Sequence, residues 1–150
     1  MRKPLLLLAW LAAASMPAHA DAAEPEINAA LSVMGYGHTV KITVNGVDVG
    51  ITGGSSQSMR LFNKGHPFAA KASPQVRARN FVLVPGENEF VIEYARAPNS
   101  RDRLEITLDA EGYPKPLLVF SDSGKGGDRR VIKLKIEEKV PADFKPAVIN

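Results

Sequence analysis

Alternation of apolar and polar residues is the feature that most limits the folds open to this chain. In residues 38–44, HTVKITV, every second residue from Val40 onward is apolar, and residues 132–136, IKLKI, repeat the pattern. Successive side chains of a β-strand point to opposite faces of the sheet, so this period of two predicts strands with one buried and one wet face. Strands of that kind are typical of antiparallel sheets. We therefore predict an all-β chain.

Turn-forming residues separate the alternating runs. Asn45-Gly46 stands between two runs and predicts a type I′ hairpin, because both residues tolerate positive φ. Pro85-Gly86 suits the centre of a type II turn. Gly53-Gly54 and residues 123–128 predict longer connections. The pattern predicts eight or nine strands, near residues 27–34, 38–44, 47–51, 57–62, 76–84, 88–95, 103–109, 116–120 and 130–138. We expect them to form a single antiparallel β-sandwich, immunoglobulin-like or jelly-roll-like.

Residues 76–84 depart from the alternation. Arg77 and Arg79 share parity with Phe81, and a β-bulge near Asn80 would shift the register by one residue and restore the pattern. No useful length of helical periodicity follows the first twenty residues. Residues 141–150 contain two prolines and predict a tail that either frays or packs as an edge.

The first twenty residues predict a secretory signal peptide. Arg2 and Lys3 precede a ten-residue apolar run, and Ala18-His19-Ala20 is a small-residue cleavage site. The run is too short to span a bilayer. We therefore expect cleavage near Ala20 and a protein of the periplasm or one that is secreted, with no membrane span. The predicted organisation is a signal peptide at 1–20, a short leader at 21–26, a β-sandwich domain at 27–140 and a tail at 141–150.

Charge and cysteine content narrow the function classes. Loss of Arg2 and Lys3 with the leader lowers the net charge from +3 to +1. So small a charge does not favour nucleic-acid binding, which usually needs a strong basic field. The chain has no cysteine, so no disulfide stabilises it in an oxidising compartment and stability must come from the apolar core.

The turn motifs resemble those of immunoglobulin-like and galactose-binding-like β-sandwich modules of exported bacterial proteins, including non-catalytic jelly-roll domains of some glycosidases. The resemblance covers roughly residues 40–95, and the matching residues are Asn45, Gly46, Val49, Gly50, Gly53, Gly54, Leu83, Pro85, Gly86, Glu87, Asn88 and Tyr94. It implies the sandwich fold and raises carbohydrate binding as an alternative function.

Catalytic and metal-binding patterns are weak. After the leader the only histidines are His38 and His66, with no cysteine and no G-x-S-x-G motif. We expect His38 to be a surface or edge residue and His66 to have a structural role in a loop. Met34 and Met59 provide thioethers that suit Cu(I), so a periplasmic copper carrier or enzyme accessory protein stays an alternative. We predict no enzyme activity, no cofactor and no metal site.

A long connection is the strongest indication of a binding site. Residues 63–75 predict a loop of unusual length, and such loops are commonly functional. Within it the candidate contact residues are His66, Pro67, Phe68 and Lys71. For a carbohydrate, stacking platforms would be Tyr36, Phe68 or Tyr113. The leading prediction is a non-catalytic recognition or assembly module that binds another cell-envelope protein, and the alternative partner is a polysaccharide.

Overall fold

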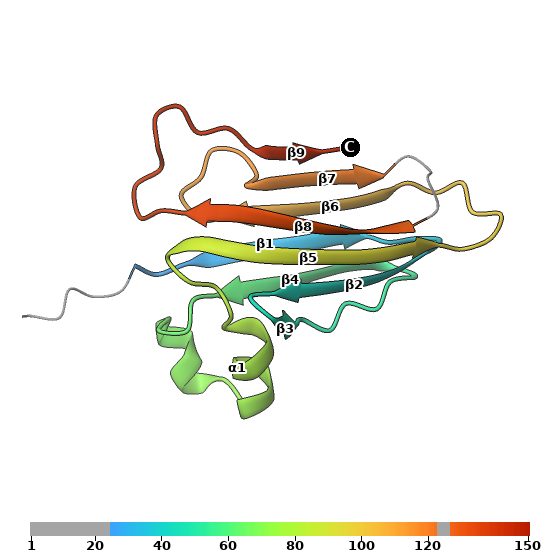
Figure 1. Cartoon of the computed structure of the whole chain (residues 1–150). Coiled ribbons are helices and arrows are strands. Elements are labelled where there is room, and N and C mark those ends of the chain that lie inside the picture. Colours follow the sequence, from blue (N-terminus) through green and yellow to red (C-terminus); the bar gives the residue numbers. More distant parts are fainter. Residues whose placement is uncertain (1–24, 123–126) are drawn as a thin grey trace, which may run out of the picture.

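A computed structural model of the chain describes residues 25–122 and 127–150, which form nine strands and two short helices (Figure 1). The predicted all-β class is confirmed. The predicted signal peptide, most of the leader and residues 123–126 of one predicted connection lie outside the described residues. In chain order the elements are β1 (Asn28–Met34), β2 (His38–Val44), β3 (Val47–Asp48), β4 (Ser56–Phe62), the 3-10 helix η1 (Pro67–Lys71), α1 (Pro74–Asn80), β5 (Gly86–Arg96), β6 (Leu104–Ala110), β7 (Leu118–Asp122), β8 (Gly127–Ile136) and β9 (Ala147–Ile149).

The strands form two sheets. One has five strands in the order β4-β1-β6-β7-β9, and the other has four in the order β3-β2-β5-β8. Neighbouring strands are antiparallel, except that β7 and β9 are parallel. In Figure 1, β5 and β8 pass in front of β1 and β6, β9 lies at the top and α1 lies at the bottom. No helix in the described ranges is long and apolar enough to cross a membrane.

Both sheets contribute to one hydrophobic core. Leu31 lies opposite Leu108 across β1 and β6, Ile42 lies opposite Ile92 across β2 and β5, and all four belong to the same buried cluster. The predicted alternation is confirmed along these strands, and the predicted core aromatics Phe90, Tyr94 and Phe120 are buried. Each large apolar side chain that is fully buried stabilises the fold by about 1.5–3 kcal/mol.

The two short turns have the predicted backbone. Asn45 (φ 48°) and Gly46 (φ 82°) link β2 to β3 with positive φ at both positions, as a type I′ turn requires. Gly86 has φ 92° after Pro85, and the buried Asn88 side chain closes this turn. Its Oδ1 accepts from Val84 N (2.9 Å), and its Nδ2 donates to Val84 O (2.8 Å).

The prediction of a strand at 76–84 is wrong. The predicted bulge near Asn80 and the prediction that the chain has no helix are wrong as well. Residues 74–80 form α1 instead. Ser73 caps the helix by accepting from Val76 N (3.2 Å), and Pro74 occupies the first turn, where its missing N–H costs nothing. After α1 the first buried residue is Phe81.

The predicted loop at 63–75 is also partly helical, because η1 and the start of α1 fall within it. Residues 63–82 form a helical excursion between β4 and β5. Its two ends meet where Asn63 bridges Leu83 and Leu83 N donates to Phe62 O (3.0 Å). Neither helix buries any residue, so the two helices lie outside the core, whereas Val82 at the end of the excursion belongs to it.

The C-terminal segment takes one of the two predicted outcomes. Residues 147–149 form β9 and pair with β7 at the edge of the five-stranded sheet, where Val119 lies beside Val148. Ala147 N donates to Leu117 O (2.9 Å) and starts this pairing.

Candidate functional site

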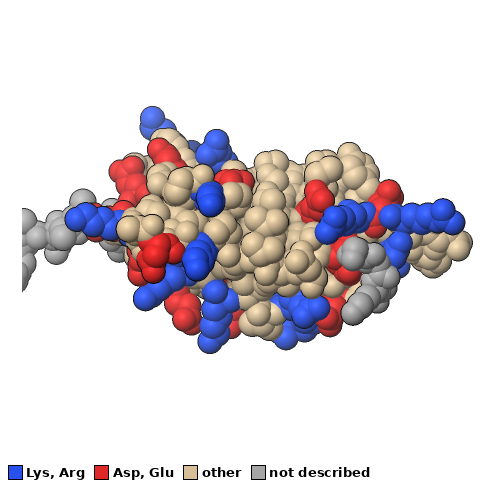
Figure 2. All heavy atoms as spheres, turned by 90° about the horizontal axis from the view of Figure 1, so that it is seen from above, with Lys and Arg blue, Asp and Glu red and all other residues tan. Residues whose placement is uncertain are grey.

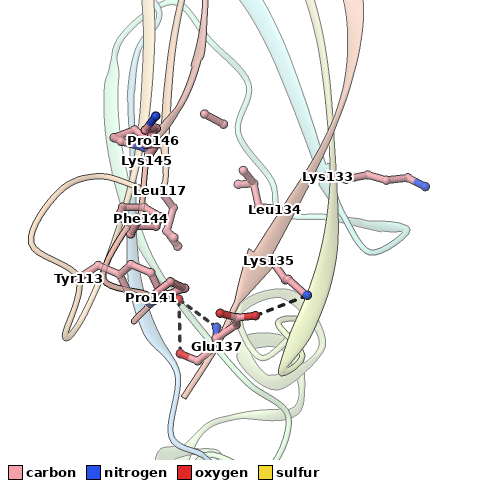
Figure 3. A pocket seen from close by; sticks show the side chains of 11 residues that line it. Tyr113, Leu117, Lys133, Leu134, Lys135, Glu137, Pro141, Phe144, Lys145 and Pro146 are labelled. Atoms are coloured by element: carbon pink, nitrogen blue, oxygen red, sulfur yellow. Dashed lines mark hydrogen bonds and ion pairs between the residues drawn. The ribbon is translucent and has the colours of Figure 1, made fainter. Parts of the chain in front are cut away.

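A groove runs along the edges of the two sheets, between β8 and the segment that leads into β9 (Figure 3). Its volume is about 350 Å³. We call it the edge groove, and its lining residues are Tyr113, Leu117, Lys133, Leu134, Lys135, Glu137, Pro141, Phe144, Lys145, Pro146 and Ala147. Leu117, Leu134, Phe144 and Ala147 give it an apolar floor, while charged side chains lie at its rim.

Strand β8 supplies one wall because it is the last strand of its sheet. It pairs with β5 along its whole length, from Gly127 opposite Ala95 to Ile136 opposite Gly86. Within the described part of the chain no strand pairs with its other side. An edge strand of this kind presents unpaired backbone N–H and C=O groups. Leu134 points toward Leu117 and Phe144, whereas Lys133 points away from the groove (Figure 3).

The proline-rich C-terminal segment supplies the other wall. Phe144 N donates to Pro141 O (3.1 Å), which turns the chain. The Phe144 ring then meets the Tyr113 ring edge to face, with centroids 4.9 Å apart and an interplanar angle of 72°. This geometry is favourable for aromatic pairs, and it fixes the segment beside β8.

One end of the groove is closed by a hydrogen bond between the sheets. Tyr113 Oη accepts from Glu137 N (2.9 Å), and Lys135 Nζ lies 3.5 Å from Glu137 Oε1. The hydroxyl therefore pairs the backbone N–H that directly follows β8. Figure 2, which looks onto this side from above, shows a band without Lys, Arg, Asp or Glu across the middle and charged residues at either side.

In residues 25–122 and 127–150 no three His, Cys, Asp or Glu side chains lie close enough to hold a metal ion together. Burial, and then the hydrogen bond and negative charge of Asp122, raise the pKa of the Tyr94 hydroxyl above its ordinary value of 10.0. Tyr94 packs edge to face on Phe120 of the other sheet, with centroids 5.5 Å apart.

The predicted site residues fall into three places. His66, Pro67, Phe68 and Lys71 lie together at η1, Tyr113 lines the edge groove, and Tyr36 lies in the turn between β1 and β2. The His66 and Phe68 ring centroids are 4.6 Å apart. Phe68 and Tyr36 are exposed, by 56% and 49% respectively.

His66 has a structural contact, since its Nδ1 accepts from Phe68 N (3.2 Å) and caps η1. His38 was expected at the surface or an edge, and that prediction is wrong. It is only 4% exposed, because its side chain has the inward parity of Val40 and Ile42. Its Nδ1 lies 2.8 Å from Tyr36 O.

Sequence reasoning missed most of the edge groove. Leu134 is an ordinary core residue by parity with Ile132 and Ile136, Leu117 stands in an apolar run, and nothing in the sequence identifies β8 as an edge strand. Phe144 carries the one local signal, since an aromatic residue between Pro141 and Pro146 is suited to packing in a constrained turn.

Comparisons with protein families, with curated proteins and with solved structures found no match to this chain. Its functional interpretation therefore depends on its own residues and geometry.

Proposed function

We propose that this protein is an exported, non-catalytic recognition or assembly module that binds an extended segment of another cell-envelope protein along β8. The observation that supports the proposal is the unpaired side of this ten-residue strand, which lies beside an apolar groove. An extended peptide can join such an edge as an added strand, with main-chain hydrogen bonds supplying affinity and side-chain pockets supplying specificity.

The fold proposed with this function is an antiparallel β-sandwich, immunoglobulin-like or jelly-roll-like. Two features support it: one buried cluster draws on both sheets, and Tyr94 of β5 contacts Phe120 of β7 across them. Export is supported by the leader at residues 1–20. N-terminal sequencing of the protein recovered from the periplasm tests the export and should begin at Asp21.

The alternation of β8 defines the segment that would bind. Ile132, Leu134 and Ile136 are buried, while Val131, Lys133 and Lys135 are exposed. An added strand continues this pattern, so every second residue of the partner lies over the groove floor and should be apolar. The intervening residues lie on the wet face near the two lysines, where acidic or polar side chains are favoured.

Site-specific photocrosslinking tests the strand geometry. A photoreactive residue is placed in turn at Val131, Lys133 and Lys135, and the adducts formed in the native envelope are mapped by mass spectrometry. Strand addition predicts adducts on one partner segment, displaced by two residues from each position to the next. Lys41 is the matched control, because it is exposed on β2, an interior strand of the same sheet.

Scattered adducts, or equal crosslinking from Lys41, would contradict the proposal. Adducts to a second copy of the same chain would mean that β8 mediates self-association instead, and the partner claim would then fail.

Carbohydrate binding is the second candidate, because the exposed rings of Tyr36 and Phe68 are open to stacking. Tyr113 is a poorer platform than expected, since Phe144 packs against its ring. Affinity electrophoresis through a panel of polysaccharides tests this function. Retarded migration that is lost in Phe68→Ala supports it, and uniform mobility removes it.

A further inference from the structure

A second groove lies between the helical excursion and β3. Its volume is about 410 Å³. We call it the basic groove. Its floor is apolar, with Val47, Phe81 and Val82, and its cations are Lys64 and Arg77. In Figure 1 the excursion with α1 lies at the bottom of the molecule, on the opposite side from β9. Occupation of the edge groove therefore leaves the basic groove free.

The sequence around the basic groove carries charge of one sign. Residues 49–86 contain no Asp or Glu, and their five cationic residues are Arg60, Lys64, Lys71, Arg77 and Arg79. So one-sided a segment is unusual in a chain whose net charge without the leader is only +1. The positive potential of a surface of this kind attracts acidic partners and speeds their association.

The cations of residues 49–86 also differ from those of β8, because the β8 cations form ion pairs with carboxylates. On β8, Arg129 lies 3.7 Å from Glu93, and Lys133 lies 3.6 Å from Glu87. Among the described residues, none of the five cations of residues 49–86 forms an ion pair. Arg60 and Arg79 donate only to the neutral amides of Asn28 and Asn80. Their positive charge is therefore not balanced by close carboxylates.

The excursion carries four of these five cations, namely Lys64, Lys71, Arg77 and Arg79. Its helices are capped by His66 and Ser73, and Asn80 Nδ2 donates to Arg60 O on β4 (2.8 Å). Phe81 stacks on Phe62, with centroids 4.9 Å apart and an interplanar angle of 24°. The groove floor thus packs on Phe62 of β4, while α1 and η1 bury none of their own residues.

We propose that the basic groove binds an acidic peptide segment of a partner protein. An apolar side chain of that segment lies on Phe81 and Val82, and flanking carboxylates meet Lys64 and Arg77. Charge complementarity identifies the occupant as acidic, and the concave apolar floor suits a single side chain better than the flat surface of a bilayer. This second docking surface is independent of strand addition at β8, and together the two would let the protein bridge two partners.

Fluorescence polarisation with a short labelled peptide tests the proposal. The peptide carries a central Phe flanked on both sides by Asp and Glu, and one control peptide replaces these acids by Asn and Gln while another replaces the Phe by Ala. We expect saturable binding of the acidic peptide at low ionic strength, weakened by added NaCl. Both control peptides should bind at least about tenfold more weakly, a loss of about 1.4 kcal/mol.

Charge reversal locates the site. Arg77→Glu and Lys64→Glu should each weaken binding of the acidic peptide about tenfold. Lys41→Glu is the matched control, because Lys41 is also exposed but lies on β2 and does not line the groove, and it should change binding less than twofold. Thermal unfolding should be unchanged in all three variants, since none of these side chains is buried.

Three results would overturn the proposal. These are no binding of the acidic peptide at low ionic strength, weakening of binding by Lys41→Glu equal to that by Arg77→Glu, or equal binding of the peptide in which Ala replaces the central Phe. Vesicles containing phosphatidylglycerol form a further arm. Vesicle binding that is lost in Arg77→Glu, without peptide binding, would assign this surface to a membrane and refute the peptide. None of these assays involves β8, so they fail or succeed separately from the crosslinking experiment.

Discussion

Tyr113 Oη lies 2.9 Å from Glu137 N, and this hydrogen bond joins the turn after β6 to the end of β8. The two residues belong to segments that extend different sheets. Because Phe144 also packs on the Tyr113 ring, one side chain positions both walls of the edge groove.

Removing this hydroxyl should weaken the fold modestly. Tyr113→Phe keeps the ring contact with Phe144 but loses two hydrogen bonds, the one accepted from Glu137 N (2.9 Å) and the longer one donated to Glu137 O (3.4 Å), so we expect a loss of about 1–2 kcal/mol in the free energy of unfolding. Chemical denaturation measures it, and hydrogen exchange at the Glu137 amide should become faster. Tyr36→Phe is the control, since the exposed Tyr36 side chain has no hydrogen bond in the described structure, and it should change stability by less than about 0.5 kcal/mol.

Alanine substitutions at two adjacent glycines should distinguish the cost of backbone strain from the cost of a steric clash. Gly53 and Gly54 both have positive φ, 81° and 74°. A Cβ at Gly53 would lie 2.5 Å from His38 O and 2.7 Å from Val40 N, whereas one at Gly54 would meet nothing within 4 Å. Gly54→Ala should therefore cost about 1 kcal/mol from strain alone. Gly53→Ala should cost about 1–3 kcal/mol more, because β2 must shift, and equal losses in the two variants would contradict this packing.

The Asn88 side chain is the most heavily bonded buried amide. Besides its contacts with Val84, its Oδ1 accepts from Asn45 Nδ2 (2.8 Å) and its Nδ2 donates to Gly86 O (3.1 Å). Asn88→Ala leaves several of these groups without a partner, so the free energy of unfolding should fall by at least about 2 kcal/mol. Asn28→Ala removes one exposed bond to Arg60 and should have a far smaller effect in the same denaturation assay.

Stability should fall at alkaline pH because of Tyr94. Its pKa is raised by burial and by Asp122, so the folded state keeps the hydroxyl proton after the unfolded chain begins to lose it near pH 10. The stabilisation is complete below that pH and is lost as the pH rises through the pKa of the folded state. Tyr94→Phe should have a flatter stability profile above about pH 10. Parallel profiles for the two proteins would refute the assigned role.

Short-range patterns predicted the strands well because alternation and turn chemistry are local properties. Val40 and Ile42 face inward as their parity requires, and Asn45-Gly46 turns the chain where two positive φ angles are needed. The same reasoning failed at residues 76–84, where a seven-residue helix is too short to show a clear period. Ser73-Pro74, a cap followed by a first-turn proline, was the signal that outweighed the weak alternation.

The two grooves could not be predicted because they depend on which strands become neighbours. Leu134 lies on β8 and Leu117 directly precedes β7 of the other sheet, and only the arrangement of the strands places both at the edge groove. The basic groove was partly visible, since the 63–75 segment was predicted to be a binding loop. Its floor was not, because Phe81 and Val82 were assigned to a strand.

The bridge between Asn63 and Leu83 has an evolutionary consequence. It closes the excursion at its base, and because η1 and α1 bury none of their residues, mutations in these two helices change a surface without repacking the interior. Selection for a new partner and selection for thermal stability can thus act on separate residues. The chain can acquire new binding specificities while its resistance to unfolding is unchanged.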